Sequence, residues 1–113
     1  MSNIDLMDEQ TFQRMVVEVA RINGWKVAHF PASLSVRGRH MTATAYDAAG
    51  YPDLTLVSSS GVMWRELKTD KGIIGPKQIE WLRILHESGC DAGVWRPKDW
   101  ARIVQELTTK KEG

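Results

Sequence analysis

The sequence predicts a single α/β domain with the element order α-β-β-β-α-β-α and a mixed sheet flanked by helices. Apolar residues recur at helical spacing near the N-terminus, which is typical of an amphipathic helix. Two short apolar runs flank the turn sequence SSSG, which is typical of a hairpin. A helical segment lies between the third and fourth expected strands, so these two strands should be parallel neighbours.

The length and composition fit one globular domain over residues 1–113. Two domains in 113 residues would each have too small a core. No apolar run approaches the ~18 residues of a membrane span, and the polar start MSNIDLMDEQ is not a secretory signal. The single cysteine, Cys90, excludes an intramolecular disulfide and a cysteine-based zinc site. We therefore expect a cytoplasmic protein without a membrane partner.

Helices are expected at residues 8–23, 76–88 and 98–108. Asp8 is a good N-cap for the first helix, and Gly24 stands where glycine commonly ends one. Pro76 suits the first turn of the second helix, and Gly89 should stop it. The first helix carries one apolar stripe, formed by Phe12, Met15, Val16, Val19 and Ile22.

Strands are expected at residues 25–30, 54–57, 62–68 and 92–95. The intervening residues 31–50 lack a clear period and are rich in small and turn residues, which predicts a long loop. Loops of this length in compact domains are usually functional or mobile. Residues 19–46 contain no acidic side chain, so arginines in the loop could contact phosphates. A solvated basic loop is the alternative.

Charged side chains lie at the ends of the two hairpin strands. Because side chains alternate along a strand, Glu66 and Lys68 share one face of the third strand. The turn joins the opposite ends of the hairpin, so Asp53 should arrive beside Glu66. Carboxylate oxygens suit Mg²⁺ or Mn²⁺, and a nearby lysine can orient a water. The alternative is a turn-starting aspartate beside an ordinary charged strand surface.

A glutamine falls on the apolar stripe of the second helix. In projection Gln78 lies with Leu82 and Leu85, and a buried amide needs hydrogen-bond partners. It could reach across to the carboxylates at the strand ends. Exposure in the first helical turn is the alternative.

The first helix offers a further carboxylate. Glu9 and Glu18 lie on opposite edges of its stripe, so both cannot reach one site, and periodicity alone does not choose between them. His29, at a strand end, is either a general base or a packing residue.

Three stretches carry a resemblance to a known family. GYPDLTLV, MWRELKTDKGIIGPKQIEWLRILHESGCDAGVWRPKDW and EQTFQRMVVEVARINGWKVAHF resemble the VRR-NUC domain, a branch of the PD-(D/E)XK nuclease superfamily. The resemblance covers nearly the whole chain. It implies a restriction-endonuclease-like core and cleavage of DNA phosphodiesters that depends on Mg²⁺ or Mn²⁺.

The resemblance also implies roles for individual residues. By position, Asp53 and Glu66 would be metal ligands, with the main-chain carbonyl of Leu67 as a third. Lys68 would assist the water, and Gln78 would support the site.

The family's helix-one glutamate is matched by Glu9, and candidate DNA contacts are Arg37, Arg39 and Lys71. Stand-alone phage and bacterial members resemble Holliday-junction resolvases and act as homodimers. The expected function is therefore a structure-selective endonuclease acting at four-way junctions, where a two-fold dimer matches a two-fold substrate. Cleavage of flaps or linear duplex, and DNA binding without catalysis, are the alternatives.

Overall fold

The computed structural model describes residues 7–30 and 46–109, and the expected order of elements is confirmed. The elements are α1 (Glu9–Ile22), β1 (Lys26–His29), β2 (Leu54–Ser58), β3 (Gly61–Leu67), α3 (Pro76–Glu87), β4 (Asp91–Trp95), the 3₁₀ turn η3 (Pro97–Asp99) and α4 (Trp100–Thr108). The last helix therefore begins with a 3₁₀ turn where a continuous helix was expected. Most of the expected long loop, residues 31–45, lies outside the described residues.

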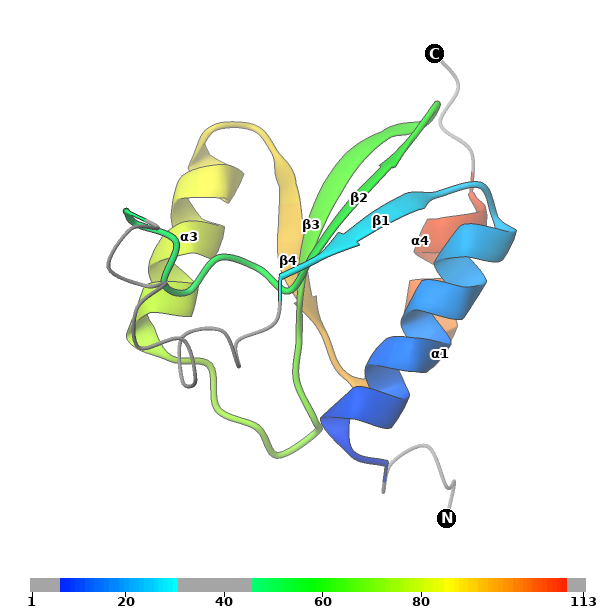
Figure 1. Ribbon diagram of the computed structural model, residues 1–113, viewed down its shortest axis with the longest axis horizontal. Coiled ribbons are helices and arrows are strands. Elements are labelled where there is room, and N and C mark those ends of the chain that lie inside the picture. Colours follow the sequence, from blue (N-terminus) through cyan, green and yellow to red (C-terminus); the bar gives the residue numbers. More distant parts are fainter. Residues whose placement is uncertain (1–6, 31–45, 110–113) are drawn as a thin grey trace.

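The four strands form one mixed sheet in the order β1-β2-β3-β4. The pairs β1–β2 and β2–β3 are antiparallel, and β3–β4 is parallel, with α3 as the crossover between them. Helices α1 and α4 lie on one side of the sheet and α3 lies on the other (Figure 1). The fold is thus the mixed, helix-flanked sheet that the sequence predicts.

The core lies between the sheet and the α1–α4 pair. The side chain of Asp8 accepts a hydrogen bond from the Thr11 N–H at 2.7 Å and so starts α1 as expected. The Trp25 indole N–H donates to the Leu107 carbonyl at 2.9 Å, which ties the end of α1 to the end of α4. The buried apolar residues are Phe12, Val16, Ala20, Trp25, Leu54, Leu56, Met63, Leu67, Trp95, Ile103 and Leu107.

Helix α3 is packed much more lightly than α1 and α4. It contains no buried residue, and Ile79 is 53% exposed. The expectation that its apolar stripe is buried was therefore wrong, because among the described elements α3 has no second helix beside it on its side of the sheet (Figure 1). The turn at residues 46–50 lies against α3, and there the Trp81 indole N–H donates to the Asp47 carbonyl at 2.9 Å.

Over the parts of the chain that the structure describes, no helix combines the length and the apolar character that a membrane crossing requires.

Candidate active site

Asp53 and Glu66 meet where β2 begins and β3 ends. The β2–β3 register pairs Leu54 with Arg65, so the residue before β2 lies beside the end of β3. The Asp53 N–H donates to Glu66 Oε1 at 3.2 Å, and the Leu67 N–H donates to Asp53 Oδ2 at 2.9 Å. Both side chains are buried, with 8% and 2% of their surfaces exposed. The convergence of these two carboxylates is therefore present.

Gln78 completes the hydrogen bonding of Glu66. Its Nε2 donates to Glu66 Oε2 at 2.7 Å, and its Oε1 accepts from the Gly75 N–H at 2.8 Å. Both ends of the amide are therefore used, which fixes the orientation of the side chain. Gln78 lies in the first turn of α3, half-buried, and still makes the contact across to the strand end that the sequence suggests.

The surroundings of Glu66 strongly affect its protonation. Burial is the largest cause and the nearby Asp53 carboxylate the next, and together they raise the pKa of Glu66 from 4.5 to about 8. The Lys68 ammonium acts in the opposite direction but does not cancel them. Near neutral pH, the site therefore favours either a proton on Glu66 or a cation beside the pair.

Glu9, and not Glu18, is the glutamate of α1 that faces the pair. Burial and then Asp53 raise the pKa of Glu9, while Lys68 and His29 lower it, so its charged neighbours are residues of this site. Glu18 lines a separate hollow with residues of α1 alone. The choice that periodicity left open is thus made by the direction in which the N-terminal turn of α1 points.

The other candidate residues have different positions. Lys68 directly follows β3 and is half-buried, and its N–H donates to the Trp95 carbonyl at 3.1 Å. Lys71 is exposed on the next loop. His29 Nδ1 is 3.5 Å from Gln13 Nε2, at the limit of a hydrogen bond. Arg37 and Arg39 lie outside the described residues.

The oxygen atoms of the site fit a hard divalent cation. Within residues 7–30 and 46–109, no group of three or more His, Cys, Asp and Glu side chains is placed to hold a metal ion. Two carboxylates are nevertheless enough for Mg²⁺, which keeps several waters and takes substrate oxygens as further ligands. The N–H and C=O of an extended residue point to the same side. Since the Leu67 N–H bonds Asp53, the Leu67 carbonyl is directed toward the pair as well.

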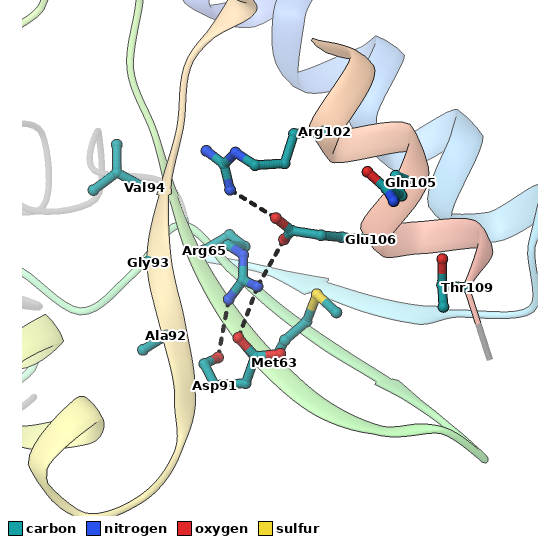
Figure 2. A pocket seen from close by; sticks show the side chains of 10 residues that line it. All are labelled: Met63, Arg65, Asp91, Ala92, Gly93, Val94, Arg102, Gln105, Glu106 and Thr109. Carbon is teal, nitrogen blue, oxygen red and sulfur yellow. Dashed lines mark hydrogen bonds and ion pairs between the residues drawn. The ribbon is translucent and has the colours of Figure 1, made fainter. Parts of the chain in front are cut away.

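Sequence reasoning missed a third buried charged residue, on the opposite face of the sheet from Glu66. Arg65 is 5% exposed and forms ion pairs with Asp91 at 2.8 Å and Glu106 at 3.0 Å, and its guanidinium carbon lies 4.9 Å from the centre of the Trp95 ring. Figure 2 shows Arg65, Asp91 and Glu106 beside a hollow between β4 and α4. The volume of this hollow is about 520 Å³. Strand alternation could have revealed it, because Arg65 lies on the same face of β3 as the core residues two positions before and two positions after it.

Comparisons with known proteins bear on the fold. No protein-family model matches the chain, and no curated protein matches it. Among solved structures, the chain is similar to a protein described as a "VRR_NUC domain protein", with a TM-score of 0.63 and 18% sequence identity. The superposition covers 94% of this chain and 98% of the other. At that identity the likeness establishes architecture alone, so the chain has the fold of a VRR_NUC domain protein.

Proposed function

We propose that the protein is a metal-dependent nuclease that hydrolyses DNA phosphodiesters. The observation that carries the proposal is the buried, hydrogen-bonded pair of Asp53 and Glu66, with Lys68 two residues beyond Glu66. Buried carboxylates placed this close are costly unless a cation or a proton lies between them. The VRR_NUC-like fold supports the same reaction class.

The ligands of the metal follow from the donor atoms. Asp53, Glu66 and the Leu67 carbonyl would hold Mg²⁺ or Mn²⁺, whose chemistry is to neutralise charge on a phosphate and to acidify water. The chain's own groups then divide the remaining work. Lys68 orients the attacking water and offsets the negative charge that develops on the phosphate. Gln78 keeps Glu66 in one orientation through the bond at 2.7 Å.

Glu9 adds negative charge at the edge of the same site. Its charged neighbours are Asp53, Lys68 and His29, which supports a role in holding a water in the outer shell of the cation. We assign it this supporting role because Glu9 is exposed, whereas Asp53 and Glu66 are buried.

We propose that the substrate is branched DNA, and in the first place a four-way junction. The protein would be of the stand-alone phage or bacterial type and would cleave as a homodimer. A two-fold dimer would present two sites to the two symmetry-related strands of a junction. The exposed Lys71 would contact phosphates close to the site, together with Arg37 and Arg39 beyond the described residues.

The test is cleavage of a four-way junction, a flap and a linear duplex at one salt concentration, with Mg²⁺, with Mn²⁺ and with chelator. Asp53→Ala and Glu66→Ala should each abolish cleavage and leave DNA binding largely intact. Glu87→Ala, an exposed carboxylate of α3, is the matched control and should cleave like wild type. Wild-type rates in either site variant would refute the assignment. Preference for flap or duplex would reassign the substrate, and binding without any cleavage would indicate a DNA-binding module.

A further inference from the structure

We infer that Arg96 is a positioning residue for Lys68, acting through the loop that joins β3 to α3. Lys68 directly follows β3, and residues 69–75 lead from it to α3 and are here called the β3–α3 loop (Figure 1). The structural part of the inference stands on its own contacts. Only its catalytic consequence depends on the nuclease function proposed above.

The side chain of Arg96 binds backbone carbonyl groups of the β3–α3 loop. Its Nη1 lies 2.6 Å from the Thr69 carbonyl oxygen, 2.8 Å from that of Gly72 and 3.3 Å from that of Asp70. Nη1 carries two N–H groups, so the two short contacts use both donors and the longer contact shares one of them. Three carbonyls from four consecutive residues thus converge on one cation.

The segment that carries Arg96 is itself fixed. The Arg96 N–H donates to Asp99 Oδ2 at 3.0 Å, and the N–H of Lys98 donates to Asp70 Oδ1 at 3.0 Å. The second of these bonds runs from η3 back to the β3–α3 loop. The loop is therefore held by a side chain from one residue and by a main-chain donor from another, both directly after β4.

The held loop touches the lysine of the candidate site. A Cβ placed on Gly72 would lie 3.3 Å from Lys68 Cδ and 3.1 Å from Thr69 Oγ1, so Gly72 lies directly beside the aliphatic part of Lys68. Because Arg96 binds the Gly72 carbonyl, it sets the position of the wall on which Lys68 rests. Lysine has a long and flexible side chain, and such a wall limits where its ammonium group can go.

The decisive variant is Arg96→Met, which keeps the apolar stem and removes the donors. We expect the backbone order parameters of residues 69–72 to fall from about 0.85 to below about 0.6, with those of β3 unchanged. Carbon relaxation should report a more mobile Lys68 side chain. In single-turnover cleavage the rate should drop by roughly 10- to 100-fold at unchanged DNA affinity, because small misplacements of a catalytic group have effects of that size.

Three further variants separate positioning from general stability. Arg96→Lys, which keeps the charge and some donors, should recover part of the lost rate. Arg83→Met removes an arginine whose ion pair within the described residues is with the exposed Glu87, and it should leave cleavage and the relaxation of the loop unchanged. Gly72→Ala keeps Arg96 but pushes on Lys68, so it should slow cleavage and test the contact even if Arg96→Met fails to fold.

A double-mutant cycle with Lys68→Met tests the coupling directly. If Arg96 acts through Lys68, adding Arg96→Met to Lys68→Met should have little further effect on the rate. Multiplicative losses in the cycle, or unchanged relaxation of Lys68 and the loop in Arg96→Met, would overturn the inference. A wild-type protein that cleaves no DNA would refute the nuclease function, while the relaxation measurements would still decide whether Arg96 positions Lys68.

Discussion

The metal-free protein should lose stability as the pH rises from about 5 to about 8, and Glu66→Gln should remove most of that loss. The pKa of Glu66 is raised from 4.5 to about 8 by burial and by the Asp53 carboxylate. Between these two values the folded chain keeps a proton that the unfolded chain has released. The folded state therefore binds more protons, and the free energy of unfolding must fall as the pH increases.

The size of the effect follows from the same two values. Each unit of difference between folded and unfolded pKa corresponds to about 1.4 kcal/mol, so the loss from pH 5 to pH 8 should be roughly 3 kcal/mol. That is a large fraction of the roughly 5–15 kcal/mol that stabilises a typical domain. Since only 2% of the Glu66 surface is exposed, solvent does little to reduce it.

The assay is urea unfolding in chelator, followed by tryptophan fluorescence at several pH values. Wild type and Glu66→Gln are compared at each pH, so that other titrating groups cancel in the difference. Saturating Mg²⁺ at pH 8 should restore stability to wild type and give much less to Glu66→Gln, because a ligand stabilises only the state that binds it. A wild-type stability that is flat or rises over this range would refute the reasoning, as would an equal slope in the variant.

Three other substitutions, two of them with a matched control, have clear expectations. Gly50→Ala should lower the free energy of unfolding by at least about 2 kcal/mol, because φ is +86° and a Cβ would lie 2.5 Å from a backbone carbon of α3. Gly24→Ala, at φ +89° with open space around it, should lower it by about 1 kcal/mol, and thermal unfolding measures both. Arg65→Met should destabilise by roughly 2 kcal/mol, because Asp91 loses the buried guanidinium it pairs with and Glu106 keeps only its ion pair with Arg102. The exposed Arg83→Met should cost about 0.5 kcal/mol or less, and equal melting temperatures for the two variants would contradict this. Gln78→Ala should slow cleavage roughly tenfold at unchanged DNA affinity, because Glu66 loses the donor that fixes it; an unchanged rate would argue against that role.

Local patterns were enough to predict the fold because each element carries its own period and its own stop signals. Asp8 and the apolar stripe define α1, and the alternation in β3 places Glu66 and Lys68 together. What the patterns could not provide was the direction of a helix relative to the sheet. A projection gives the angle between Glu9 and Glu18 but not which of them points at Asp53, because that depends on how α1 packs against the sheet.

Contacts between distant residues were the other part that the sequence could not predict. Arg96 and the carbonyls it binds are separated by 24 to 27 positions, and Arg65 and Glu106 by 41. The sequence around an arginine does not reveal which distant residue it contacts, and arginine side chains are ordinarily exposed. The depth of α3 was misjudged for a related reason, since an apolar stripe indicates which face turns inward but not how completely that face is covered.

The light packing of α3 has a consequence for hydrogen exchange. Amides of α1 and β3 lie in the best-packed layer and should exchange only through global unfolding, while those of α3, which buries no residue, should exchange through a cheaper local opening. Gln78 lies in the lightly packed α3 and Glu66 in the well-packed β3, so the hydrogen bond between them joins regions of unequal stability. Any ligand that needs Gln78 in place must therefore hold α3 closed, and the slowing of exchange in α3 would measure that ligand's binding without any reference to catalysis.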